Sequence, residues 1–113
     1  MNEKNALRIF DSFAITDTGV KYPDDIAGWK DTEGVKKIAF GIENDLNQDV
    51  SVQPIGRAGG ALGNLGSPTT VTKHSTGIVC LNLNDYWAPY LSVSLTCSVA
   101  PLAGQITVNL IWR

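Results

Sequence analysis

Few residues in this sequence could combine for acid–base chemistry. Carboxylates stand close together in two places, Asp24 with Asp25 and Glu43 with Asp45, and such a pair can act as general acid and general base. Both pairs stand in polar, turn-like stretches, YPDD and IENDL, where nothing evident would raise the pKa of one carboxyl group above the other. Asp and Asn favour turns because their side chains bond to nearby backbone amides. We therefore interpret both pairs as solvated turn residues.

The single histidine is the only candidate for a base that activates a nucleophile. His74 could serve Cys80 or Ser75, but it stands in the Thr/Ser-rich stretch TTVTKHST with no carboxylate close by in sequence. We interpret it as a surface residue. Metal ligands are equally sparse, since there is no Cys-x-x-Cys motif. Four loop carboxylates could offer oxygens to Ca²⁺, but their spacing matches no EF-hand loop: Asp24, Asp25, Asp31 and Glu33. The sequence predicts no enzyme, no cofactor and no metal site.

Aromatic residues are the better candidates for binding. Four of them stand in or next to expected loops: Trp29, Tyr86, Trp87 and Tyr90. Aromatic side chains stack on ligand rings and are enriched at protein interfaces. Packing at the corners of the core is the alternative, and Tyr90, which precedes the apolar Leu91, is expected at a strand end. We take these four residues as candidate contacts to a ligand or partner.

Length and composition limit the remaining possibilities. The chain has 113 residues, of which 43% are hydrophobic and 18% charged, with a net charge of −2. This predicts a single folded domain over residues 1–113. Lys and Arg are few and scattered, which argues against nucleic acid as a partner. No apolar stretch near the beginning has the length of a signal peptide or membrane span, so we expect no membrane association and synthesis in a cytoplasm.

The apolar residues alternate with polar ones along most of the chain. This period of two, with turn signals between the segments, predicts about seven or eight short strands and no helix. We predict an all-β, antiparallel β-sandwich of jelly-roll type, with an Ig-like Greek key as the open alternative. In the last hairpin, the predicted inward set is Leu91, Val93, Leu95, Cys97, Val99, Ile106, Val108, Leu110 and Trp112. The predicted outward set is Ser92, Ser94, Thr96, Ser98, Gln105, Thr107 and Asn109.

Three further expectations concern particular segments. Cys80 and Cys97 fall on opposite faces of their strands, so both are predicted to be free thiols. Pro54 suggests an edge strand or a strand end. Residues 1–6 are expected to form a flexible arm, and the Gly-rich residues 56–68 are expected to form a mobile loop at the tip of a hairpin or between the sheets.

Two stretches, FGIENDLNQDVSVQPIG and YWAPYLSVSLTCSVAPLAGQITVNLIW, carry a resemblance to a known group. Together they resemble small β-sandwich structural domains of tailed phages and prophages, over roughly residues 38 to 112. The matching residues are Asn44, Leu46, Gln48, Val50, Pro89, Tyr90, Leu91, Val93, Thr96, Ser98, Ala100, Pro101, Gly104, Thr107 and Val108. Other members often carry a polar insertion between the matched hairpins, where this chain has GRAGGALGNLGSP.

The resemblance implies a virion structural role without enzymatic activity. The implied protein is a capsid decoration (cement) protein or a domain of a head fibre or tail accessory protein, made in the host cytoplasm. Its partners would be other virion proteins, such as a major capsid protein, and further copies of itself, with a trimer as the natural guess. The alternative hypothesis is a carbohydrate-binding or receptor-binding module that binds a glycan through Trp29, Trp87 or Tyr90.

Overall fold

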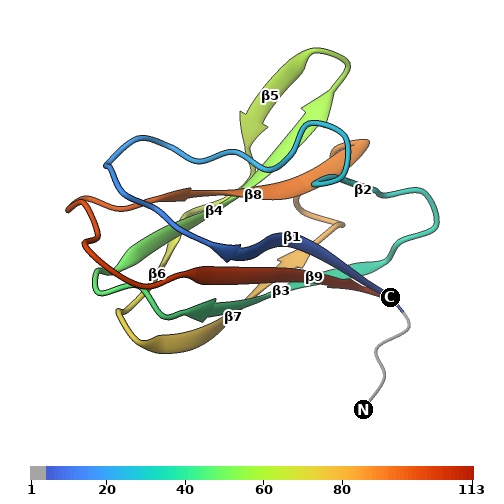
Figure 1. The fold of residues 1–113 in the computed structure, drawn as a ribbon. Coiled ribbons are helices and arrows are strands. Elements are labelled where there is room, and N and C mark those ends of the chain that lie inside the picture. Colours follow the sequence, from blue (N-terminus) through green and yellow to red (C-terminus); the bar gives the residue numbers. More distant parts are fainter. Residues whose placement is uncertain (1–4) are drawn as a thin grey trace.

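Two antiparallel sheets stacked face to face make up the computed structural model, which describes residues 5–113 (Figure 1). Within these residues there are nine strands and no helix. The first sheet has the order β1 (Ala6–Phe13), β9 (Ile106–Trp112), β3 (Lys37–Asn44) and β7 (Ser75–Asn82). The second has the order β2 (Lys30–Asp31), β8 (Tyr90–Thr96), β4 (Val50–Ala58) and β5 (Ala61–Asn64), and β6 (Thr69–Val71) also pairs with β4.

The strand pairing is that of a jelly roll. Strands β5 and β6 pair with successive parts of β4, so they share one strand position and each sheet has four positions. Strands of the first half of the chain pair with those of the second half in reverse order: β1 with β9, β2 with β8, β3 with β7, and β4 with β5 and β6. This nested order confirms the predicted β-sandwich and decides between the jelly roll and the Ig-like alternative.

The core lies between the sheets and is built by the predicted alternation. Leu91, Val93 and Leu95 of β8 are fully buried, and so are the three apolar residues that β9 contributes, Ile106, Val108 and Leu110. Two predicted core residues differ. Val99 is 55% exposed because the chain bends at Ser98 and Val99, beyond the end of β8 at Thr96. Trp112 is half-buried at the end of β9. The cysteine prediction is confirmed: Cys97 is buried, Cys80 is exposed, and both are free.

The outer face of the second sheet departs from the prediction. Ser92 and Ser94, expected to face solvent, are buried. The reason is the connection between β1 and β2, which crosses over the outside of this sheet (Figure 1). The hydroxyl of Ser92 donates a hydrogen bond of 2.6 Å to the carbonyl of Gly28 in this connection, and Lys21 exchanges two backbone hydrogen bonds with Leu95. The chain therefore covers the outer face of one sheet with its own residues.

The Gly-rich segment forms the tip of a hairpin, one of its two predicted places, but residues 56–58 and 61–64 within the predicted loop are strand. Strand β4 continues to Ala58, Gly59 and Gly60 form the turn, and β5 returns along β4. Between β5 and β6 the chain does not pair with β4, and Pro54 of β4 lies opposite this gap in the pairing. The prediction of an edge position for Pro54 is thus wrong, since β4 is an interior strand. The missing N–H is tolerated because the ladder is irregular there.

The expected N-terminal arm, residues 1–6, lies partly outside the described residues. Residues 1–4 fall outside them. Asn5 and Ala6 do not form an arm, because the Asn5 carbonyl accepts a hydrogen bond from the backbone of Trp112 and Ala6 pairs with Ile111 at the start of β1.

Candidate functional site

The four aromatic candidates lie in three different places. Trp29 and Tyr90 meet on the outer face of the second sheet, where both rings approach Arg57. Tyr86 places its ring over Gly66, in the link between β5 and β6. Trp87 lies apart from these three, in the connection between β7 and β8, and lines a cavity at one end of the sandwich. The four residues thus do not form one binding platform.

The guanidinium group of Arg57 contacts the rings of both Trp29 and Tyr90. The guanidinium carbon of Arg57 lies 4.5 Å from the ring centre of Trp29 and 5.5 Å from that of Tyr90. The same guanidinium donates hydrogen bonds to the carboxylate of Asp25 (2.9 Å) and to its carbonyl (3.1 Å). These contacts fasten the β1–β2 connection to β4. Cation–π contact of this kind contributes to stability, so we interpret Trp29 and Tyr90 as structural.

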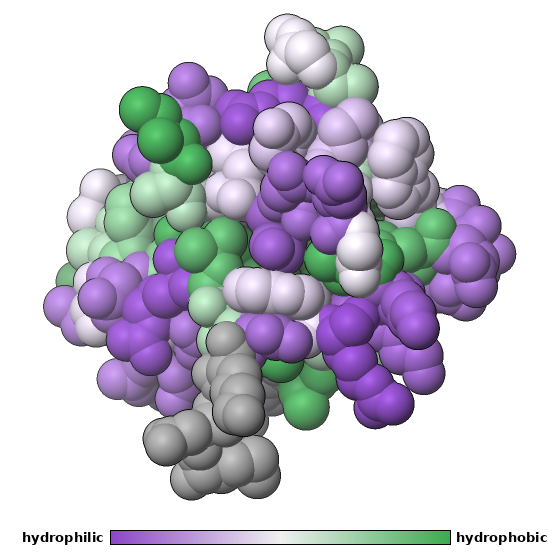
Figure 2. Space-filling view, turned by 90° about the vertical axis from the view of Figure 1, so that its right-hand side faces the viewer, coloured by the Kyte–Doolittle hydropathy of each residue, from purple (hydrophilic) through white to green (hydrophobic). Residues whose placement is uncertain are grey.

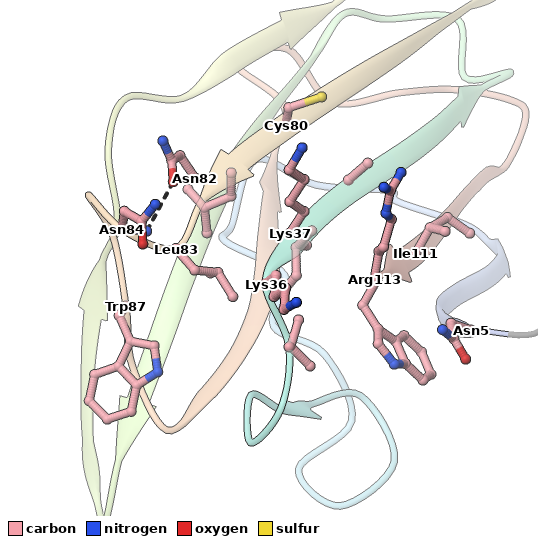
Figure 3. Close-up of a pocket in the computed structure, with 15 residues that line it drawn as sticks. Asn5, Lys36, Lys37, Cys80, Asn82, Leu83, Asn84, Trp87, Ile111 and Arg113 are labelled. Carbon is pink, nitrogen blue, oxygen red and sulfur yellow. Dashed lines mark hydrogen bonds between the residues drawn. The ribbon is translucent and has the colours of Figure 1, made fainter.

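The cavity beside Trp87 is the candidate site. It has a volume of about 1090 Å³ and opens where β3 begins and where β7 and β9 end (Figure 3). Its apolar lining comes from the end of the core and includes Val35, Leu83 and Trp112. Trp87 is 62% exposed and lies on one side of the cavity, while Arg113 lies on the other (Figure 3). We call this feature the end cavity.

Within residues 5–113, the charged side chains that line the end cavity are all basic: Lys36, Lys37 and Arg113. Its other polar side chains are the amides of Asn5, Asn82 and Asn84. Of the residues that the structure describes, no Asp or Glu lines the cavity, although the chain has 11 acidic and nine basic residues. A fourth cation, the ammonium group of Lys30, lies 3.9 Å from the ring centre of Trp112. Figure 2 views this end of the molecule, where hydrophilic and hydrophobic side chains lie side by side.

Only Trp87 of the end cavity was a candidate from the sequence. Trp112 had been assigned to the core by its strand parity, and the three basic residues had no distinguishing neighbours. What brings them together is strand pairing: Ile38 pairs with Trp112, and the backbone N–H groups of Lys36 and Lys37 donate to the main-chain oxygen of Arg113 at 2.7 and 3.1 Å. The sequence could have indicated this site only if the register of β3 and β9 were known, because that register brings Lys36 and Lys37 to Arg113.

Carboxylate and histidine candidates lie at other places. The structure brings Asp45 to His74, with 3.0 Å between the carboxylate and Nδ1, although the two are distant in sequence. Both side chains are exposed, at 83% and 59% respectively. The hydroxyl of Ser75 is hydrogen-bonded to Thr72 instead of His74, and Cys80 lies five residues further along β7, roughly 16 Å away at 3.3 Å per residue. The pair has no nucleophile beside it.

The loop carboxylates stabilise turns. The carboxylate of Asp24 accepts hydrogen bonds from the backbone of Ala27 (2.7 Å) and Ile26 (3.1 Å), and these bonds lower its pKa below the usual value. Asp31 accepts a similar bond from the backbone of Glu33. Among residues 5–113, no group of three or more His, Cys, Asp or Glu side chains is arranged to hold a metal ion.

Comparison with known proteins found no relative of this chain. No protein-family model, curated protein or solved structure matches this chain. In the described part of the chain, residues 5–113, no helix has the length and hydrophobicity to span a membrane.

Proposed function

We propose that this chain is a non-enzymatic structural protein of a phage particle. In this proposal it decorates the capsid, is bound to a major capsid protein, and forms a homo-oligomer, with a trimer expected. The resemblance of residues 38–112 to phage structural domains supports it. The jelly roll is compatible with it, because this fold recurs in viral capsid proteins, although it is found in lectins as well.

One observation carries the proposal: no segment of residues 5–113 covers the outer face of the first sheet. Ile78 projects from β7 with 75% of its surface exposed. Ala39, Gly41 and Ile111 lie beside it, around a shallow hollow of about 680 Å³. The outer face of the second sheet is instead covered by the β1–β2 connection. Exposed apolar patches on soluble proteins commonly mark interaction surfaces, so we assign this face to contact with the capsid or with another copy.

The first test is the content of virus particles. Particles produced by the organism that carries the gene should contain this chain in a fixed ratio to the major capsid protein, measured by quantitative mass spectrometry after density-gradient purification. Particles that lack the chain would refute the decoration role.

The second test uses a surface substitution. Ile78→Asp places a charge on the exposed face and should reduce the chain's occupancy of particles, or convert an oligomer to a monomer in light scattering. The matched control is Leu102→Asp, because Leu102 is 89% exposed but lies in the turn between β8 and β9. Equal occupancy and equal mass for both variants would show that this face makes no such contact.

A second candidate function is favoured by the end cavity. The exposed side chain of Trp87 lines an open cavity together with three amide side chains, while the ring of Trp112, which also lines it, is contacted by Lys30. Aromatic rings and amides are the groups that bind sugar rings and hydroxyls. A carbohydrate-binding role is therefore the alternative, and it is compatible with a place on the surface of a particle. Quenching of Trp fluorescence by a glycan, lost in Trp87→Ala, would support it.

A further inference from the structure

The end cavity combines three kinds of group that one ligand could engage together. The first is the exposed indole of Trp87, which is 62% accessible and is part of the connection between β7 and β8. A flat, apolar surface of a ligand can stack on such a ring. The C–H face of a pyranose ring is a surface of this kind.

The second kind is a pair of amides at the end of β7. The backbone N–H of Asn84 donates a 3.0 Å hydrogen bond to the side-chain oxygen of Asn82 (Figure 3). This bond fixes the orientation of the Asn82 amide, so that its NH₂ group is the donor that remains. Asn82 and Asn84 are both exposed and both line the cavity. They offer donors and acceptors of the kind that sugar hydroxyls require.

The third kind is a group of basic side chains outside the ion pairs of residues 5–113. Four ion pairs occur within residues 5–113, and their basic members are Arg8, Lys21, Arg57 and His74. The cavity residues Lys36, Lys37 and Arg113 belong to none of these pairs. Three basic side chains thus gather in one cavity, and no acidic side chain of residues 5–113 lines it, in a chain whose net charge is −2. Such clustering attracts an anionic group.

We propose that the end cavity binds an acidic saccharide, with the sugar ring on Trp87 and its carboxylate between Lys36 and Arg113. The inference rests on the carbohydrate-binding candidate and specifies its ligand class. Lys36 and Arg113 come from neighbouring backbone, because the N–H of Lys36 donates to the main-chain oxygen of Arg113 at 2.7 Å. An Arg guanidinium binds a carboxylate through paired N–H groups, and a Lys ammonium adds a point charge beside it.

The test compares a charged sugar with its neutral ester. Isothermal titration calorimetry is carried out with trigalacturonate and with its methyl ester, and likewise with sialyllactose and its methyl ester. We expect at least one acid to bind, and its ester to bind about tenfold or more weakly, since esterification removes the negative charge and otherwise adds only a methyl group to each carboxyl group. Binding of the acid should weaken further as salt is raised.

Variants separate the contributions of the groups. Trp87→Ala should abolish binding of acid and ester alike. Lys36→Gln together with Arg113→Gln should weaken the acid about tenfold and leave the ester unchanged. Lys73→Gln is the matched control, because Lys73 is an exposed lysine in the turn between β6 and β7, and it should change neither. All these side chains are exposed, so each variant should fold, which urea unfolding verifies.

Each outcome decides a different point. Equal binding of acid and ester would overturn the acidic-ligand inference while leaving the carbohydrate-binding candidate intact. Absence of binding by all four sugars at millimolar concentration would overturn both. Binding of ATP in preference to the sugars would also overturn the inference, because a nucleotide shares the stacking ring and the negative charge. None of these results bears on the particle test for capsid decoration.

Discussion

Gly104, in the turn between β8 and β9, offers the sharpest test of the structure. Its φ is +95°, and a Cβ atom at this position would lie 2.0 Å from the carbonyl oxygen of Asp45. That oxygen belongs to the backbone of the β3–β4 turn and cannot rotate away. The two turns are joined by backbone hydrogen bonds from Asp45 to Gln105 (2.9 Å) and from Asn47 to Ala103 (3.2 Å). An added methyl group must therefore push the turns apart.

The expected cost of Gly104→Ala follows from these two effects. A positive φ costs an L-residue about 1–2 kcal/mol. Separation of the turns removes two backbone hydrogen bonds, each contributing about 1 kcal/mol net. We expect Gly104→Ala to lower the free energy of unfolding by about 3–4 kcal/mol, measured by urea unfolding followed through Trp fluorescence.

Substitutions at two further glycines distinguish the cost of a positive φ from the cost of a steric clash. At Gly34, φ is +74° but a Cβ would meet nothing within 4 Å, so Gly34→Ala should cost only about 1–2 kcal/mol. At Gly63, φ is ordinary and the space is open, so Gly63→Ala should stay within about 0.5 kcal/mol of the parent or stabilise it slightly. A loss for Gly104→Ala no larger than that for Gly34→Ala would refute the close approach of the two turns.

Three other predictions test burial and charge. Ser92→Ala removes the buried hydrogen bond to Gly28 and should cost about 1–2 kcal/mol in urea unfolding. In the native protein, Cys80 should react with a thiol reagent while Cys97, whose pKa is raised by burial, reacts only after unfolding. Because the pKa of Asp24 is lowered on folding, its stabilising contribution is present above the unfolded pKa of about 3.9 and is lost as the pH falls through the lower folded value. Asp24→Asn should thus flatten the acid limb of the stability–pH curve.

Strand alternation was the part of the fold that the sequence predicted best. The inward residues of β8 and β9 follow from a period of two, because successive side chains on a strand point to opposite faces. The same local rule separates buried Cys97 from exposed Cys80. It failed at Val99, where the strand had already ended.

The prediction also failed where a distant segment covers a polar face. Alternation predicted that Ser92 and Ser94 face solvent, but both are buried. Alternation indicates which side of the sheet a residue faces, and it does not indicate what packs on that side. The Gly-rich composition predicts a loop at a hairpin tip or between the sheets, because glycine disfavours strands. Pairing with β4, itself an interior strand, was enough to make residues 61–64 a strand.

The candidate site depends most on tertiary structure. The sequence predicted Trp87, Trp29 and Tyr90 alike as aromatic residues in or next to loops. In the structure, however, the rings of Trp29 and Tyr90 contact Arg57. The end cavity exists because Ile38 pairs with Trp112, a partner 74 positions away, so that Lys36 and Arg113 become neighbours.

By itself, therefore, the sequence determined the fold class, the inward residues of the strands and the absence of a disulfide, because these follow from periodicity and parity within short segments. Only the tertiary structure decided the jelly-roll order, the covered and uncovered sheet faces, and the basic end cavity. The physical reason is that these depend on which strands pair and in what register, and that choice is made by burial summed over the whole core.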